Sequence, residues 1–190
     1  MHAVGAGVTK FKPGDRVVVG AITPDWGSDE AQNGFPSQST GALGGWKFAN
    51  IKAGVFAEYF HVNEADANMA LIPAAVTSEQ AVCCADMLST GFMGAEHGEI
   101  PIGGTVAVFA QGPVGLMSTA GATLRGAGCI IAVETDPRRA APARQYGAHI
   151  VVDFRKEDPV ARILALHRRR RRRHRDRGAR LRRASRTASR

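Results

Sequence analysis

Cysteine is scarce in this 190-residue sequence, and its positions exclude two common classes of small protein. The three cysteines are Cys83, Cys84 and Cys129; the first two are adjacent and the third lies within an apolar run. This pattern contains neither the spacing of a disulfide framework nor a Cys-x-x-Cys metal knuckle. The scarcity therefore predicts a reduced, cytoplasmic compartment. Long apolar runs and a secretory leader are also missing, so the sequence predicts no membrane partner.

Acidic residues are almost missing from residues 168–190, although the net charge of the whole chain is +8. This segment holds 13 arginines and a single acid, Asp176, so it carries +12 and the preceding residues carry −4. The basic charge therefore belongs to the tail and not to the body of the protein. A run of like charges has no apolar face to bury, which predicts that residues 167–190 are disordered.

Two interpretations of the arginine-rich tail remain open. Arginine codons of the CGG and CGC type become glycine and alanine codons when they are read one base out of frame, so a frameshifted or truncated gene would produce such a segment. Alternatively, the arginines form an arm that neutralises phosphates. The tail lacks aromatic residues that would stack on bases, so nucleic acid is the disfavoured partner and a nucleic-acid-binding tail is kept only as an alternative function.

The most informative stretch, residues 103–136, has the order of a dinucleotide-binding unit. A β-branched apolar run, Thr105–Phe109, predicts a buried strand. A turn of small residues follows, and then a helical pattern that ends at Leu124. A second apolar run, Cys129–Val133, is followed by the acid Glu134. This order predicts a nicotinamide dinucleotide site, and the alternative is a glycine-rich turn of another α/β protein.

The cofactor-binding residues are predicted from the chemistry that each position needs. Gly112 lacks a Cβ, so a pyrophosphate can approach the backbone, and Gly115 allows the helix to pack closely on the strand. The N–H groups at the start of the helix attract phosphate. Glu134 is predicted to accept hydrogen bonds from the two ribose hydroxyls. One position departs from the fingerprint, because it holds alanine where the turn favours glycine. The candidates are Ala110, Gly112, Pro113, Val114, Gly115 and Glu134.

The pattern divides the chain into residues 1–75, 76–166 and 167–190. Within the second part, a helix over residues 79–96, interrupted near Asp86 or Gly91, precedes the order strand–helix–strand–helix–strand–helix. Strands that alternate with helices in this way predict a parallel sheet and therefore an α/β fold class.

The first part is rich in strand-like runs. Residues 3–8, 16–19 and 55–62 are predicted strands, and the polar region between 22 and 52, rich in glycine and serine, is predicted to be a lobe or long loop.

Four motifs in order resemble the zinc-dependent medium-chain alcohol dehydrogenases, in particular the secondary-alcohol branch. They are GVTKFKPGDRVVV from Gly7, GGWKFANIKAGVFAEYFHVNEAD from Gly44, ADMLSTGFMGAE from Ala85, and the glycine turn. The resemblance covers residues 3–166. It implies a partial GroES-like β domain followed by the first half of a Rossmann domain. It also implies hydride transfer between an alcohol or ketone and NAD or NADP, a zinc cofactor and a homo-oligomer.

The resemblance also implies site residues, each with a plainer alternative. Asp86 matches a zinc ligand, or else caps a helix. The family's upstream Cys and His ligands have no counterpart in this sequence, so we expect a fragment that lacks the N-terminal ligand region and the C-terminal half and has no activity. Trp46 matches a substrate-pocket residue and Thr90 one beside the nicotinamide; either is otherwise plain packing. Cys83, three residues before Asp86, could stand in as a ligand, but it is interpreted as a small buried hydrophobe. His97 is interpreted as a helix-end cation or a surface residue rather than a ligand.

The residues after the second strand predict NAD rather than NADP. NADP-using relatives in this branch place Gly-Ser-Arg at this point, whereas this sequence has Glu134, Thr135 and Asp136. A carboxylate beside a 2′-phosphate is repelled. Arg138 and Arg139 follow closely and are the counter-argument, because either side chain could bind a phosphate. A catalytically silent NAD-binding fragment is the remaining alternative function.

Overall fold

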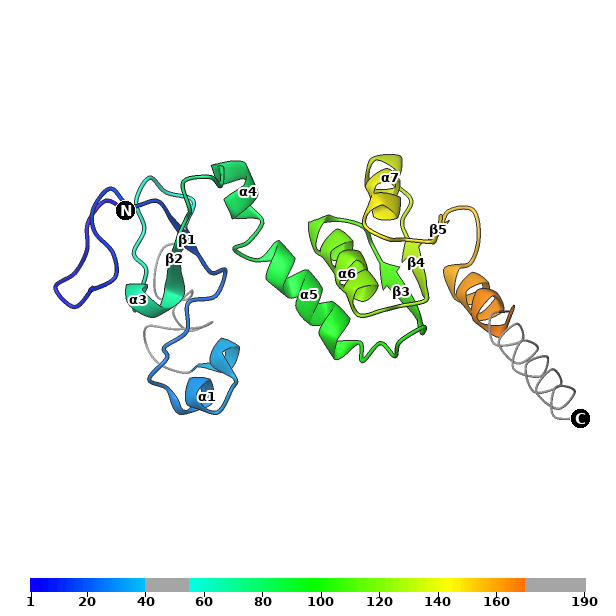
Figure 1. The fold of residues 1–190 in the computed structure, drawn as a ribbon, viewed down its shortest axis with the longest axis horizontal. Coiled ribbons are helices and arrows are strands. Elements are labelled where there is room, and N and C mark those ends of the chain that lie inside the picture. Colours follow the sequence, from blue (N-terminus) through cyan, green and yellow to red (C-terminus); the bar gives the residue numbers. More distant parts are fainter. Residues whose placement is uncertain (40–54, 170–190) are drawn as a thin grey trace, which may run out of the picture. The chain divides into compact units, whose positions relative to one another are not determined.

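The computed structural model describes residues 1–39 and 55–169. The chain divides into two compact units, Met1–Ser89 and Thr90–Arg190, and Figure 1 shows the elements of each. Trp46 and the tail from residue 170 onward lie outside the described residues. Domain boundaries at residues 75 and 166 remain predictions. Within the described ranges, no helix is long and apolar enough to cross a bilayer.

The described part of the first unit contains one antiparallel pair of short strands. β1 (Val17–Val19) pairs with β2 (Met69–Leu71), and Val18 lies opposite Ala70. The strand predicted over residues 16–19 is therefore confirmed. Short helical segments complete the described part of the unit: α1 (Asp29–Gln32), η1 (Pro36–Gln38), α3 (Ala65–Asn68) and α4 (Ser78–Val82).

Buried amide side chains hold distant parts of the first unit together. Asn68 donates from Nδ2 to the carbonyl oxygens of Pro24 and Asn63, both at 3.0 Å, and accepts at 2.8 Å from the indole Nε1–H of Trp26. Asn63 in turn donates to the Pro24 carbonyl at 3.2 Å. Since a buried amide is costly unless it is hydrogen-bonded, these contacts fix residues 24–26 against residues 63–68.

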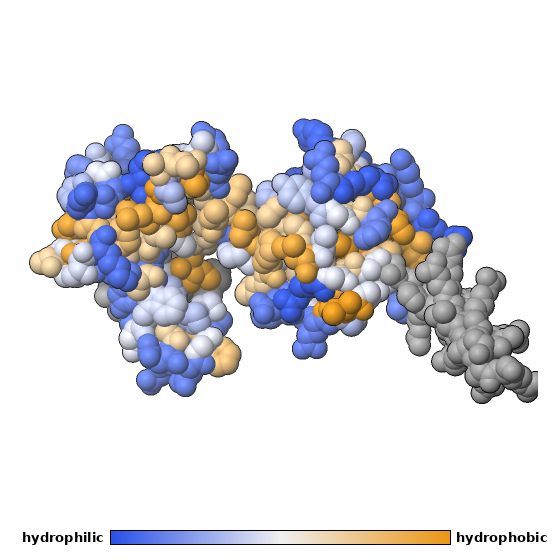
Figure 2. Space-filling view, viewed as in Figure 1, coloured by the Kyte–Doolittle hydropathy of each residue, from blue (hydrophilic) through white to orange (hydrophobic). Residues whose placement is uncertain are grey.

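Two strands predicted in the first unit are wrong. Residues 3–8 and 55–62 form no strand. Phe56 is fully exposed and Val55 is also exposed. An apolar run becomes a strand only where a neighbouring strand supplies backbone partners, and within the described residues of this unit the one ladder is β1–β2. Figure 2 shows apolar surface on both units.

The helix predicted over residues 79–96 is observed as two helices. α4 begins with a capping box formed by Thr77 and Gln80, and α5 spans Met87–His97. The interruption falls over residues 83–86, so the break predicted at Asp86 is confirmed. A break at Gly91 is wrong, since Gly91 is a buried residue of α5.

The second unit is built on a parallel sheet of the predicted order. β3 (Thr105–Phe109) pairs with β4 (Cys129–Val133), which pairs with β5 (Ile150–Val152). α6 (Pro113–Leu124) joins the first two strands and α7 (Pro137–Gln145) joins the second and third. The α/β fold class is therefore confirmed.

β4 is the centre of this unit, and all five of its residues are buried. Its side chains alternate between the two faces of the sheet. Ile131 and Val133 share one core cluster, against which Ile163 and Leu166 of the helical residues 159–169 pack. Ala132 belongs to a second cluster with Ala143 of α7 and, partly buried, Leu116 of α6. Helices therefore cover both faces of the strand that ends at Glu134.

Candidate dinucleotide-binding site

The turn between β3 and α6 begins with an unusual backbone conformation. Ala110 has φ +65°, in the left-handed region. The fingerprint favours glycine at this position for that reason, because a Cβ in this region approaches the following carbonyl oxygen. Ala110 N–H still donates to the Val133 carbonyl at 2.9 Å. The turn therefore keeps the geometry of the fingerprint in spite of the substitution.

Restoring glycine at residue 110 should make the protein more stable. The left-handed conformation costs an alanine about 1–2 kcal/mol, and glycine loses about 0.5–1 kcal/mol more backbone entropy on folding. We therefore expect Ala110→Gly to raise the free energy of unfolding by about 0.5–1 kcal/mol, measured by urea titration with circular dichroism. Ala140→Gly, in the helical backbone of α7, is the matched control and should lower it by about 1 kcal/mol. A loss of stability in Ala110→Gly would contradict this account of the turn.

The two glycines of the turn differ in their surroundings. Gly112 is the N-cap of α6, with φ −69° and ψ −176°, and an added Cβ would meet nothing within 4 Å. At Gly115, an added Cβ would collide with the Ala110 carbonyl group. Gly115 therefore allows the helix to lie against the turn, whereas Gly112 leaves open space in front of it.

The start of α6 offers backbone donors to that open space. Gly112 makes no side-chain cap hydrogen bond, and Pro113 occupies the first turn. The first N–H groups of a helix have no partner within it, and together with the helix dipole they favour an anion. The predicted residues Ala110 to Gly115 are thus brought together at one end of the sheet, and their arrangement fits a dinucleotide.

Gln111 holds the turn in place through hydrogen bonds of its buried side chain. It was not predicted from the sequence as a site residue. It is fully buried. Its Nε2 donates to the carbonyls of Val108 and Ala110, at 3.2 and 3.1 Å, and its Oε1 accepts from Thr119 Oγ1 at 3.0 Å. The sequence gives one signal for this role, a long amide among small residues in a tight turn.

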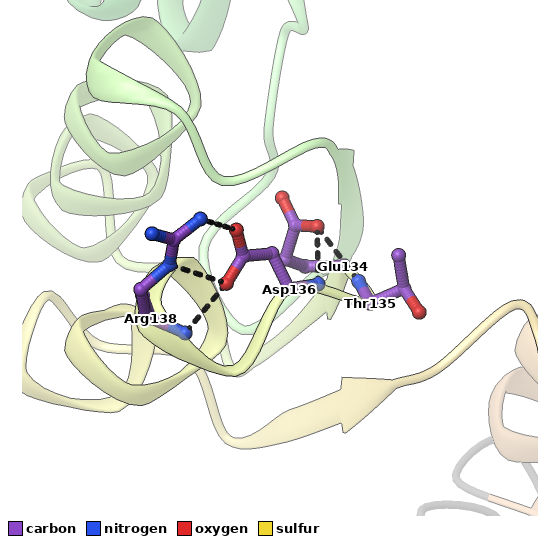
Figure 3. Close-up of polar contacts among 4 residues, drawn as sticks. All are labelled: Glu134, Thr135, Asp136 and Arg138. Carbon is purple, nitrogen blue, oxygen red and sulfur yellow. Dashed lines mark hydrogen bonds and ion pairs between the residues drawn. The ribbon is translucent and has the colours of Figure 1, made fainter.

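Glu134 lies at the end of β4 and is 5% exposed. Its Oε2 accepts from Gln111 N–H at 2.9 Å, and its Oε1 accepts from the N–H groups of Thr135 and Asp136 at 2.7 and 2.9 Å. Figure 3 shows the contacts to Thr135 and Asp136. Burial raises the pKa of the carboxyl, but these three N–H groups and nearby Arg139 outweigh burial, so the pKa lies below its usual value. Glu134 is therefore ionised at neutral pH.

Asp136 holds Arg138 beside the same strand end (Figure 3). Oδ1 of Asp136 accepts from Arg138 N–H and Nε, at 2.9 and 3.3 Å, and Oδ2 accepts from Nη2 at 2.9 Å. These bonds lower the pKa of Asp136 to about 2. The Arg138 side chain is 88% exposed, so the pair is screened by solvent and contributes little to stability. Its consequence is local: the guanidinium already has a carboxylate partner.

The residues implied by the family resemblance do not form one cluster, unlike the residues of the turn. Asp86 is exposed in the turn between α4 and α5, where its carbonyl oxygen accepts from Ser89 Oγ at 2.9 Å. Thr90 is half-buried in α5, and His97 lies in the last turn of that helix. An added Cβ at Gly91 would lie 2.7 Å from the Val114 carbonyl oxygen, so Gly91 of α5 lies next to the start of α6.

The described residues do not fit a catalytic zinc. Such a site needs three protein ligands, and within residues 1–39 and 55–169 no three His, Cys, Asp or Glu side chains are grouped to hold a metal ion. Residues 40–54 contain none of these four residue types. The interpretation of Cys83 as a buried hydrophobe is wrong, because Cys83 and Cys84 are exposed. Both lie in the turn that interrupts the helix, so neither is carried onto a packed helix face.

Comparisons with known proteins agree with the fold and the motifs. Residues 1–74 match the alcohol dehydrogenase GroES-like domain family. The chain is 55% identical over 157 residues to an NADP-dependent isopropanol dehydrogenase of Thermoanaerobacter brockii, covering 83% of this chain and 44% of that protein. It is 53% identical over 161 residues to one of Entamoeba histolytica, with 85% and 44% covered. An alcohol dehydrogenase of Cupriavidus necator is 45% identical over 180 residues, with 87% and 49% covered.

Solved structures give the same result. An alcohol dehydrogenase from Thermus sp. ATN1 superposes with a TM-score of 0.73 at 31% identity, over 85% of this chain and 48% of that one. The chain spans less than half the length of these relatives. The matched motifs, the parallel β3–α6–β4 unit and these relatives together show that the chain belongs to the zinc-dependent alcohol dehydrogenase family, of whose members it covers a part.

Proposed function

We propose that the second unit binds the adenosine and pyrophosphate part of a nicotinamide dinucleotide. The observation that carries this proposal is the open space in front of Gly112 at an uncapped helix start. The N–H groups of Val114 and Gly115 would face the pyrophosphate, and Pro113 fixes the first turn of the helix. When bound, the cofactor supplies the nicotinamide that accepts or gives a hydride.

The substrate of the whole protein is proposed from its relatives to be a small secondary alcohol or the matching ketone. Thr90 is proposed to lie beside the nicotinamide, which is supported by the packing of neighbouring Gly91 against the start of α6. Asp86 remains proposed as one ligand of a metal site that the described residues do not complete, and Trp46 remains proposed as a substrate-pocket residue. The whole protein is also proposed to form a homo-oligomer and to be located in the cytoplasm.

The cofactor is proposed to be NAD rather than NADP, although two of the relatives described above are NADP-dependent. Glu134 and Asp136 place two carboxylates at the strand end where a 2′-phosphate would lie. The carboxylate of Glu134 is ionised and would repel that phosphate. Arg138, one of the two residues that could compensate, is held by Asp136. The other, Arg139, lies close enough to Glu134 to help lower the pKa of that carboxyl.

Replacing Glu134 with glycine should shift the preference toward NADP. Loss of the negative charge removes the repulsion, so the ratio of the Kd for NADP to the Kd for NAD should fall about tenfold or more. Isothermal titration of both cofactors measures the ratio. Glu96→Gln is the matched control, because Glu96 pairs with Arg125 at the far end of α6, and it should leave the ratio unchanged. Wild-type protein that binds NADP more tightly than NAD would refute the assignment.

The 190-residue chain is expected to turn over no alcohol. Because no three zinc ligands are grouped in the described residues, we expect no tightly bound metal that could polarise the substrate oxygen. Spectrophotometric NADH formation from isopropanol should stay at the background rate, and the purified protein should hold less than stoichiometric zinc by elemental analysis. Stoichiometric zinc together with turnover would overturn this expectation.

A further inference from the structure

The Glu134 carboxylate joins two segments that are distant in the sequence. Oε1 binds the N–H groups of the two residues that follow it, whereas Oε2 binds the N–H of Gln111, 23 residues earlier in the chain. The carboxylate therefore connects the end of β4 to the turn after β3. All three donors are backbone groups, so the link does not depend on the side chains of its partners.

Gln111 is already fixed on its other side. Its side chain is hydrogen-bonded to the carbonyls of Val108 and Ala110 and to the hydroxyl of Thr119. The backbone N–H is therefore its remaining donor. That N–H belongs to the peptide that follows Ala110, whose φ of +65° is strained for alanine. A strained backbone persists where its surroundings over-determine it. The bond to Glu134 supplies one of those constraints, because it fixes the orientation of the Ala110–Gln111 peptide.

The acceptor capacity of the carboxylate limits what else it can bind. An ionised carboxylate has about four lone-pair sites. Two bonds fill Oε1, and one bond occupies half of Oε2. One site remains, on the oxygen that faces the turn. The sequence-based expectation that Glu134 accepts from both ribose hydroxyls therefore exceeds the capacity that the turn leaves free.

We propose that Glu134 is a positioning residue, whose carboxylate holds the phosphate-binding turn through Gln111 N–H and keeps a single acceptor site for one ribose hydroxyl. The second half of this proposal rests on the proposed cofactor site, and the first half does not. The cofactor preference and the shape of the turn are then set by one side chain. A substitution made to change the preference also releases the turn.

Amide hydrogen exchange of the full chain without cofactor tests the link to the turn. Glu134→Gln keeps the size of the side chain, but its Nε2 cannot accept the Gln111 N–H while Oε1 serves Thr135 and Asp136. Exchange at Gln111 should rise about tenfold or more, as expected for the loss of a hydrogen bond to a charged group, while Ile130 and Ile131 keep their rates. Thr135→Val removes the 2.7 Å bond to Asp153 at the same strand end and should leave Gln111 unchanged. An unchanged Gln111 rate in Glu134→Gln would overturn the proposal.

If Glu134→Gln fails to fold, a measurement on the wild-type chain can still test the hydrogen bond between Glu134 and Gln111. A scalar coupling across the hydrogen bond, between the Gln111 amide nitrogen and the carboxyl carbon of Glu134, should be observable by NMR. Its absence, with couplings observed across the β3–β4 ladder, would also overturn the proposal.

Two NAD analogues test the single remaining acceptor site. Each lacks one hydroxyl of the adenosine ribose, at 2′ or at 3′. One analogue should bind the wild-type chain about tenfold more weakly than NAD, and the other should bind like NAD. Equal losses for both analogues would refute the single-acceptor claim. If wild-type protein binds no NAD, the proposed function fails, and the exchange experiment still decides whether Glu134 holds the turn.

Discussion

Gly112→Ala is expected to fold like the wild-type protein and to lose most of its affinity for NAD. The backbone of Gly112, with φ −69° and ψ −176°, is open to alanine, and an added Cβ would meet no protein atom within 4 Å. That Cβ would instead occupy the space that the pyrophosphate needs. A misfit of about 3 kcal/mol corresponds to a Kd about 100-fold higher.

Two measurements on Gly112→Ala separate binding from folding. Its free energy of unfolding should stay within about 1 kcal/mol of wild type, because alanine is only a poorer N-cap than glycine. Isothermal titration with NAD then reports the loss of affinity. Unchanged affinity in a folded Gly112→Ala protein would show that the dinucleotide does not pass in front of this residue.

Gly115→Ala, three residues later, is expected to damage the turn itself. The added Cβ would collide with the backbone carbonyl of Ala110, which cannot move without displacing the end of β3. The free energy of unfolding should fall by about 3 kcal/mol, even though alanine is favoured over glycine in a helix by about 1 kcal/mol. NAD binding should be lost in the same variant.

Gly94→Ala provides the control for helical glycines in this unit. An added Cβ there meets only Ser118 Oγ, at 3.3 Å, and alanine favours the helix. Its stability, measured by the same urea titration, should stay close to that of the wild type. A Gly115→Ala protein as stable as this control would contradict the close approach of α6 to the turn.

The second unit could be predicted from the sequence because its elements are defined by local pattern. The apolar runs of β3 and β4 flank a glycine turn, and α7 begins at Pro137 after the Asp136 cap. The sequence indicates a conflict at Ala110, because the turn favours glycine, and the positive φ of Ala110 shows that the turn prevails. Tertiary contacts of Gln111 and β4 outweigh the intrinsic preference of alanine at this position.

The first unit could be predicted less well, because strands depend on partners that local pattern does not reveal. Residues 55–62 alternate like a strand, yet Val55 and Phe56 are exposed and form no ladder. The prediction that Cys83 is buried is wrong for a related reason, since the helix that would have buried it ends at Val82. The role of Glu134 could be predicted only in part. Its position after the strand indicates a ribose contact, but its bond to Gln111 depends on how the turn folds back.

An NMR titration of the 190-residue chain with NAD tests the central claim most directly. The claim is that β3, the turn, α6 and β4 form a dinucleotide site. Saturable shifts should be concentrated at the amides of Gly112, Val114 and Gly115 and at Glu134, with the first unit unaffected. The same titration of Gly112→Ala should show no such shifts. Wild-type protein whose turn amides do not respond to millimolar NAD, in spectra of a folded chain, would contradict the account.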